Sequence, residues 1–260
     1  MIYIIKFIVT ILSLILLFSV PIHALDNQGG RGYSWFCVHR KDNLQPSCDP
    51  SFSFIDKYDG FYIDKAHGDE CDDKVVYLTF DVGYGNENVE RILDTLKNEE
   101  VIGAFFILGN MLSAHSDLVK RMHDEGHLVC NHTYSHKTMV CRSEEEFAAE
   151  LNKLDDAYFA ISGKHLSKYY RPPEGRFDEA SLEYAQKMGY KTVFWSFAYA
   201  DWDNNKQMSS DKARTKILEN IHNGEIMLLH PTSSTNATIL PEIIQELKRR
   251  GFRFGSLDEL

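Results

Sequence analysis

The sequence has no excess of basic residues and no long basic stretch. Its 28 lysines and arginines are outnumbered by 38 aspartates and glutamates, which gives a formal net charge of −10. Because non-specific nucleic-acid binding depends on lysine and arginine neutralising phosphates, nucleic acid is excluded as a partner. The one basic run, Lys248-Arg249-Arg250, is typical of a helix C-terminus, where positive side chains are favourable.

Two further signals are missing. No strand-like run is followed by a glycine-rich phosphate-binding fingerprint, which argues against a nucleotide-binding, doubly wound sheet. The chain also contains no internal repeat and no low-complexity tract. A length of 260 residues, with 43% hydrophobic and 25% charged residues, is typical of one globular α/β domain.

The N-terminus, residues 1–24, is apolar. Lys6 precedes an uncharged run from Phe7 to Ile22, and Ile22-His23-Ala24 resembles a signal-peptide cleavage site. The run is short for a full membrane span, so a cleaved export signal and an uncleaved membrane anchor both stay open. Either one predicts an exported, extracytoplasmic protein, in the cell wall or an intermembrane space. The second also implies membrane attachment through this segment.

Cysteine is scarce, and the number of cysteines, five, is odd. Cys37, Cys48 and Cys71 lie in residues 25–74, an N-terminal extension rich in proline, glycine and aspartate with little periodicity. A disulfide, for example between Cys37 and Cys48, suits an exported segment that has little core of its own. The odd count leaves at least one thiol free or paired between molecules.

Strand-like and helix-like segments alternate over residues 75–260, which we interpret as the main domain. Apolar runs predict strands at 75–80, 101–108, 127–130, 168–171, 191–197, 225–229 and 252–257. Amphipathic stretches predict helices at 88–98, 114–125, 143–162, 178–188, 209–223 and 236–250. This alternation implies a parallel sheet with helices outside it. We therefore expect an α/β fold, an incomplete (β/α) barrel of about seven parallel strands.

Ionisable side chains follow five of these predicted strands. They are Asp81, His132 and His136, Arg171, Asp201 beside Trp202, and His230. In a barrel, residues after the C-terminal ends of the strands converge on one face. The i, i+4 spacing of His132 and His136 would place both imidazoles on one side of a helical turn, a spacing used for divalent metals. Each residue alone is more often a cap, a core residue or a solvated group, but together they predict a hydrolytic site.

These residues also carry a family resemblance. TFDVG, HTYSH, RPPEG, ADW and LLH occur in this order and at the separations found in the polysaccharide deacetylase family, the carbohydrate esterases of the NodB-homology type. The resemblance covers roughly residues 74–260 and extends to the delta-lactam-forming de-N-acetylases of spore cortex peptidoglycan. It implies a deformed, incomplete (β/α) barrel, a divalent metal, usually zinc, and peptidoglycan glycan strands as the partner.

The resemblance assigns four catalytic roles. Asp81 corresponds to the base, and Arg171 orients it and lowers its pKa. His230 corresponds to the general acid that protonates the departing sugar nitrogen. Asp201 pairs with His230 and favours its imidazolium form.

The metal site departs from the family pattern at Val82. His132 and His136 correspond to metal ligands, but Val82 stands where the family normally has a second aspartate as the third ligand. Two neutral imidazoles without an anion hold a zinc ion more weakly, so we expect reduced metal affinity. The lactam-forming subgroup often carries asparagine here, so loss of this acid is compatible with activity. Cys130 is expected to be a small core residue rather than a thiolate ligand.

The remaining predictions concern the substrate. Trp202 and Leu228 are expected to line the acetyl pocket and Tyr84 to contact sugar, whereas Trp195 is expected in the core. The leading hypothesis is metal-dependent removal of N-acetyl groups from peptidoglycan amino sugars, especially N-acetylmuramic acid freed of its peptide. Two alternatives stay open: a catalytically silent glycan-binding module that has lost its metal, and a deacetylase of another N-acetylated glycan or amide.

Overall fold

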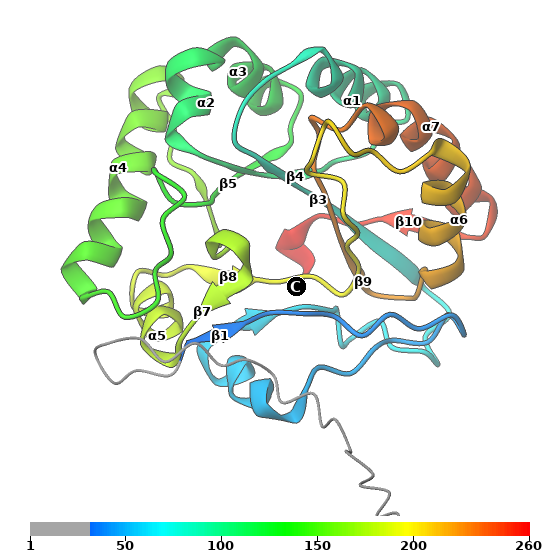
Figure 1. The fold of residues 1–260 in the computed structure, drawn as a ribbon, viewed down its shortest axis with the longest axis horizontal. Helices are drawn as coiled ribbons and strands as arrows, with labels where there is room; N and C mark the ends of the chain where they lie inside the picture. The colour runs from blue at the N-terminus through cyan, green and yellow to red at the C-terminus, as the bar shows by residue number, and fades with distance from the viewer. Residues whose placement is uncertain (1–31) are drawn as a thin grey trace, which may run out of the picture.

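The computed structural model describes residues 32–260 of the chain, and Figure 1 shows how they fold. The predicted export signal or anchor, residues 1–24, lies outside the described residues. Within residues 32–260, none of the helices combines the length and apolar character needed to cross a membrane.

A parallel sheet of eight strands forms the centre of the fold. The strands are β2 (Gly60–Phe61), β3 (Lys74–Val82), β4 (Ala104–Ile107), β5 (Leu128–Asn131), β6 (Ser167–Tyr170), β8 (Lys191–Val193), β9 (Glu225–Leu229) and β10 (Phe252–Phe254). They lie in the order β10-β3-β4-β5-β6-β8-β2, with β9 also paired to β3. Every one of these pairings is parallel.

The sheet curls into an incomplete barrel, as predicted. β3 pairs with β9 through Val76–Phe80 and with β4 through Thr79–Val82. The far side is joined by two isolated bridges to β9: Phe197, just after β8, pairs with Met227, and Ile63, just after β2, pairs antiparallel with Glu225. All seven predicted strands form. The eighth, β2, belongs to the N-terminal extension, and its two residues are too few to show a periodic pattern.

Helices surround the barrel (Figure 1). They are α1 (Glu87–Asn98), α2 (Gly109–Ala114), α3 (Ser116–Asp124), α4 (Glu144–Ser162), α5 (Glu179–Lys187), α6 (Ser210–Asn220) and α7 (Ser234–Arg249). Local signals fix their ends. The side chain of Asn86 caps the first N–H groups of α1, and α4 begins at a capping box formed by Ser143 and Glu146. α4 ends at Gly163, whose φ of 70° suits glycine.

The N-terminal segment from residue 32 runs along the side of the barrel between α5 and α6 (Figure 1, blue). It supplies β1 (Tyr33–Ser34), which pairs antiparallel with β7 (Arg176–Phe177), and the 3₁₀ helix η1 (Pro50–Tyr58). Trp35 is only 5% exposed, and its ring stacks on Phe194 with centroids 4.6 Å apart. Its indole N–H donates to the carbonyl oxygen of Trp195 at 2.9 Å. Trp35 and β1 therefore anchor this segment in the wall of the barrel.

The expected disulfide between Cys37 and Cys48 is not formed, and both residues are free thiols. Different parts of the wall hold them. The thiol of Cys37 is hydrogen-bonded to the backbone of Ala198, and burial raises its pKa to about 11. The backbone N–H of Cys48 donates to the hydroxyl of Tyr62 at 3.3 Å. Cys130 lies fully buried in the core, as predicted.

Replacing Trp35 tests whether the extension stabilises the barrel. We expect Trp35→Ala to lower the free energy of unfolding by about 3–5 kcal/mol, because a large buried ring is deleted. The adjacent Phe36 is 45% exposed, so Phe36→Ala should cost about 1 kcal/mol. Urea denaturation of the full chain measures both, and equal midpoints for the two variants would contradict this role.

Candidate active site

One cavity of about 520 Å³ opens at the carboxyl ends of the strands. Six of the nine predicted site residues line it: Asp81, His132, His136, Trp202, Leu228 and His230. Arg171 and Asp201 are fully buried and bonded to two of these. Tyr84 is the exception: it does not line the cavity and is 45% exposed, and its hydroxyl accepts a hydrogen bond from Asn204. The predicted contact between Tyr84 and the reacting sugar is thus not supported by its position.

Arg171 fixes Asp81 at the mouth of β3. Its Nη1 donates to Asp81 Oδ1 at 2.8 Å, and its Nη2 donates to Thr79 Oγ1 at 2.9 Å. Its Nε donates to the carbonyl of Val193, and the guanidinium lies 4.1 Å from the ring centroid of Phe106. Burial alone would raise the pKa of Asp81, but the charge of the Arg171 guanidinium holds it below its usual value. Asp81 is therefore ionised at neutral pH.

His132 presents a free ring nitrogen beside this carboxylate. Its Nδ1 lies 2.8 Å from the carbonyl oxygen of Arg171, which can only accept, so Nδ1 carries the proton. Burial, opposed by the charge of Asp81, lowers the pKa of His132 to about 4, which keeps the ring neutral. Nε2 then faces Asp81 Oδ2 at 3.5 Å. Lone pairs on both atoms favour a cation or a hydrogen-bond donor between them.

His136 completes the pair of imidazoles from a loop rather than from a helix. The rings of His132 and His136 have centroids 5.0 Å apart, but the predicted helical turn is wrong. Thr133 and His136 have φ values of 68° and 58°, and residues 132–136 are not helical. Instead the side chain of Asn131 accepts from the N–H of Thr133, whose hydroxyl accepts from the N–H of His136. These side-chain bonds shape the loop and bring the rings together.

The donor set fits a divalent metal, though with few ligands. Neutral imidazole nitrogen is a common zinc ligand, and the carbonyl of Arg171 orients His132 for that role. Val82 contributes nothing, because its side chain is fully buried in the main hydrophobic core. Across residues 32–260, no three histidine, cysteine, aspartate or glutamate side chains are grouped to hold a metal. The residues whose chemistry suits a metal here are His132 and His136, with Asp81 close by.

His230 and Asp201 form a second acid–imidazole pair lining the same cavity. Asp201 Oδ1 lies 2.7 Å from His230 Nδ1, and its Oδ2 accepts from the backbone N–H of His230 at 2.8 Å. Asn236 Nδ2 donates to the same Oδ2 at 2.6 Å. Burial lowers the pKa of His230, but the hydrogen bond and charge of Asp201 outweigh it, so the pKa is raised. Nδ1 is engaged, which leaves Nε2 as the nitrogen available to a substrate.

Several cavity residues were not predicted from the sequence. Glu174, Trp195 and Tyr199 line the cavity together with Gly175 and Ala198. Trp195 also packs against two core clusters, so its predicted core position is only half of its role. Glu174 lay within the RPPEG segment that suggested the family, but nothing in the sequence shows which residue of that segment faces the cavity.

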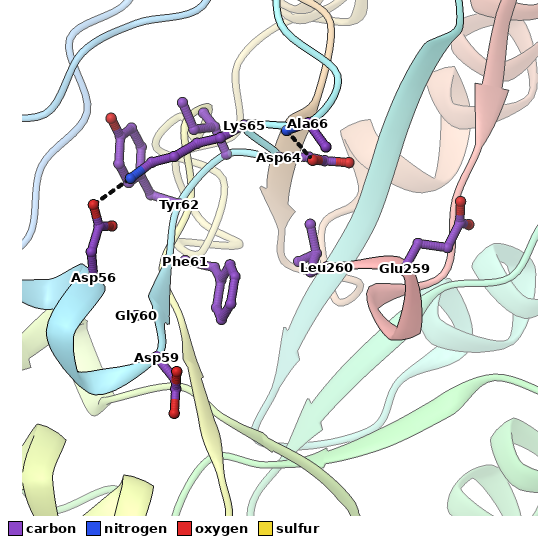
Figure 2. A pocket seen from close by; sticks show the side chains of 11 residues that line it. Asp56, Asp59, Gly60, Phe61, Tyr62, Asp64, Lys65, Ala66, Glu259 and Leu260 are labelled. Carbon is purple, nitrogen blue, oxygen red and sulfur yellow. Dashed lines mark hydrogen bonds and ion pairs between the residues drawn. The ribbon is translucent and has the colours of Figure 1, made fainter.

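A second cavity, of about 400 Å³, lies where β2 meets the C-terminal residues Glu259 and Leu260 (Figure 2). Its acidic side chains are already engaged within the protein. Asp56 is paired with Lys65, and Asp64 accepts from the backbone N–H of Ala66 at 2.8 Å. Asp64 also accepts from the hydroxyl of Tyr77. This cavity offers no pair of groups comparable to those around Asp81 and His230.

Comparison with known proteins agrees with this geometry. Residues 68–193 match the polysaccharide deacetylase family. The chain is 38% identical over 208 residues to the peptidoglycan-N-acetylmuramic acid deacetylase PdaA of Bacillus subtilis, covering 80% of this chain and 77% of PdaA. It is 32% identical to a peptidoglycan-N-acetylglucosamine deacetylase of Bacillus cereus, covering 80% of this chain and 74% of that protein.

Solved structures show the same relationship. The structure of Bacillus subtilis PdaA, described as a family 4 carbohydrate esterase, superposes with a TM-score of 0.83 at 36% identity, covering 88% of this chain and 96% of that one. BA3943 of Bacillus anthracis, described as a family 4 pseudoenzyme, superposes with a TM-score of 0.69 at 29% identity, covering 77% and 68%. On this evidence the chain belongs to the polysaccharide deacetylase family.

Proposed function

We propose that this protein is a metal-dependent peptidoglycan deacetylase that hydrolyses the N-acetyl amide of N-acetylmuramic acid residues. The observation that carries the proposal is one cavity lined by an ionised carboxylate, Asp81, and by an imidazole held toward its charged form, His230. Amide hydrolysis needs a proton acceptor for the attacking water and a proton donor for the leaving nitrogen. Asp81, paired with Arg171, supplies the acceptor, and His230, paired with Asp201, supplies the donor.

The residues divide the reaction as follows. Asp81, oriented by Arg171, takes a proton from the water that adds to the acetyl carbonyl. His230, as imidazolium, gives its proton to the sugar nitrogen while the carbon–nitrogen bond breaks, and acetate and a free amine are released. Leu228, which is 4% exposed, and the exposed ring of Trp202 line the cavity and bound the space for the acetyl group.

A divalent metal ion, for which we propose zinc, would be held by His132 and His136, would polarise the acetyl carbonyl and would acidify water. Compared with a site that has a second aspartate, these two imidazoles supply no negative charge. We therefore propose that the metal is bound less tightly than in relatives with a carboxylate at position 82.

The sugar and the location are also proposals. N-acetylmuramic acid is supported by the 38% identity to PdaA, whose name specifies that sugar. Deacetylation of a muramic residue exposes an amine that can close on its lactyl carboxyl group as a delta-lactam, the modification of spore cortex. Peptidoglycan lies outside the cytoplasmic membrane, so we propose that the enzyme is exported by, or anchored through, its N-terminal segment.

A catalytically silent glycan-binding module is the second candidate. Two observations favour it: Val82 removes a ligand, and the similar structure BA3943 is described as a pseudoenzyme. Two intact pairs argue against it: Asp81 with Arg171, and His230 with Asp201. Arg171 and Asp201 are buried, and their pairing with Asp81 and His230 offsets the cost of burial while holding a proton acceptor and a proton donor at the cavity.

Acetate release tests the reaction. With added zinc and peptide-stripped peptidoglycan strands, the full chain should release acetate, and His230→Ala should lower kcat by roughly 100-fold or more because the proton donor is lost. His165 makes a similar contact with Asp155 on the surface, so His165→Ala is a matched control and should keep full activity. Equal release from the wild type and His230→Ala would refute the proposal.

The pH profile tests the pair of His230 and Asp201. Activity should be lost as the pH rises through the raised pKa of His230, because the imidazolium form is the donor. Asp201→Asn removes the charge that raises this pKa, so the alkaline limb of kcat should move to lower pH. The titration of His230 followed by NMR should shift in the same direction, and an unchanged titration in Asp201→Asn would show that this carboxylate does not control the imidazole.

Zinc binding tests the metal ligands. Calorimetric titration should show that the wild type binds zinc and releases it readily to chelators. His132→Gln and His136→Gln should each weaken binding by roughly 100-fold or more, since each removes one of two protein ligands. His165→Gln serves as the control and should bind as the wild type does. If all three variants bind zinc equally, the assigned ligands are incorrect.

A further inference from the structure

A chain of buried hydrogen bonds leads from the cavity wall to the pair of His230 and Asp201. Asp201 and Asn236 are each 1% exposed, and Tyr199 is 6% exposed. Asn236 Nδ2 donates to Asp201 Oδ2 at 2.6 Å and to the carbonyl oxygen of His230 at 3.2 Å. The hydroxyl of Tyr199, which lines the cavity, donates to Asn236 Oδ1. The amide of Asn236 therefore connects the cavity wall to the carboxylate that holds the imidazole.

The partners of Asn236 determine which way its amide points. A carboxylate oxygen and a backbone carbonyl oxygen can only accept, so the amide nitrogen must face Asp201 and His230. The amide oxygen then faces Tyr199, whose hydroxyl has to keep its proton in order to donate. Burial and the charge of Asp201 both raise the pKa of Tyr199, which agrees with this role. A reversed amide would place an oxygen against two acceptors, so the orientation is fixed.

The connection from β9 to α7 places Asn236 at this point. The backbone N–H of Ser233 donates to the carbonyl of His230 at 3.2 Å, and the hydroxyl of Ser233 accepts from the backbone N–H of Asn236 at 3.1 Å. Ser233 is the N-cap of α7, and Asn236 lies in the first turn of that helix. The helix therefore presents Asn236 to Asp201 as a donor whose position is set by the backbone.

The hydrogen bond from Asn236 has its largest effect after His230 has given up its proton. While His230 is protonated, the imidazolium balances the charge of Asp201. Once the proton has left, the buried carboxylate carries an unbalanced charge, which is costly. A hydrogen bond to an anion stabilises the charged form, and it does so most when no cation is adjacent. The amide thus makes it easier for the pair to release the proton.

Two other charged groups act on His230 from neighbouring strands. Asp81 of β3 favours the imidazolium, and Arg171, which follows β6, opposes it. Replacing Asn236 or Tyr199 leaves both of these groups in the protein. The contribution of the amide can therefore be measured against an unchanged set of charges.

We propose that Asn236, oriented by Tyr199, is a positioning residue that fixes the Asp201 carboxylate and limits how tightly Asp201 keeps the proton on His230. This inference rests on the proposed function, in which His230 is the proton donor, and deepens it. An acid that holds its proton too tightly is a poor donor. Asp201 keeps His230 protonated, and Asn236 keeps that proton available to the leaving nitrogen.

Removal of the amide tests the proposal. Asn236→Leu keeps the approximate shape of the side chain and removes its donor, so the titration of His230, followed by NMR in the full chain, should move upward by roughly one pH unit. The alkaline limb of kcat should move upward with it. At neutral pH, kcat should fall roughly tenfold with KM nearly unchanged, because the proton is released less readily.

The direction of the shift distinguishes this role from a merely structural one. If Asn236 only supported the packing, its loss would free Asp201 from His230 and the titration would move downward, as expected for Asp201→Asn. Tyr199→Phe is a milder variant that keeps the ring and removes only the hydroxyl that orients the amide. It should move the titration of His230 upward by a smaller amount than Asn236→Leu does.

Two substitutions away from the cavity serve as matched controls. Asn220→Leu removes a buried amide that donates to a backbone carbonyl within α6. Tyr58→Phe removes the hydroxyl of a buried tyrosine that donates to a carboxylate of α5. Both controls should keep the titration of His230 and the pH profile of the wild type.

The outcomes separate this inference from the proposed function. If the titration of His230 is unchanged or moves downward in either folded variant, the inference is overturned. If Asn236→Leu does not fold, Tyr199→Phe decides by the same criterion. If the wild type releases no acetate while the titration moves upward in the variants, the proposed function fails and the control of His230 by Asn236 stands.

Discussion

The buried guanidinium of Arg171 is the interaction on which the rest of the site depends. Its side chain holds the carboxylate of Asp81, and its own carbonyl fixes the tautomer of His132. Through Thr79 and the carbonyls of Val193 and Phe194 it also ties β3 to the segment that begins at β8. A charge that is completely buried is costly unless all of its donors are used. Here the donors are used by the groups that must stay in place around the cavity.

The second pair sets the opposite electrostatic condition. Asp81 is kept ionised by a cation, whereas His230 is kept protonated by an anion, Asp201. One cavity thus holds a proton acceptor and a proton donor in the states that hydrolysis requires at the same pH. Burial alone would raise the pKa of Asp81 and lower that of His230, but their partners lower the first and raise the second. Such perturbed pKa values are characteristic of acid–base sites.

Position 82 lacks the carboxylate of the family pattern, and this affects how tightly a metal would be held. Val82 belongs to the hydrophobic core, so a divalent metal held here would meet two neutral imidazole rings, with the carboxylate of Asp81 nearby. A less neutralised metal is a stronger Lewis acid but is held less tightly. Although position 82 supplies no ligand, both acid–base pairs are kept: Asp81 with Arg171, and His230 with Asp201.

Much of this protein could be deduced by reading along the chain. Seven strands, six helices and the residues at the strand ends follow from apolar periodicity and capping, which are local properties. The family motifs assigned Asp81, His132, His136, Arg171, Asp201 and His230 to one site, and the structure brings them together. Local patterns failed where the geometry depends on distant partners. The two histidines converge through a loop, not a helical turn, and β2 forms only because β8 offers it an edge.

Packing in three dimensions decided the remaining features. Trp35 and β1 brace the turn at Gly175, about 140 residues further along the chain, and Trp35 also bonds to Trp195. These distant contacts decide that Trp195 lines the cavity and where Glu174 lies. Tyr84 lies outside the cavity for the same kind of reason, since the loop containing Asn204 holds it. A sequence fixes which chemical groups exist and which lie at strand ends, but the distance between groups on separate segments is set only when the whole core closes around them.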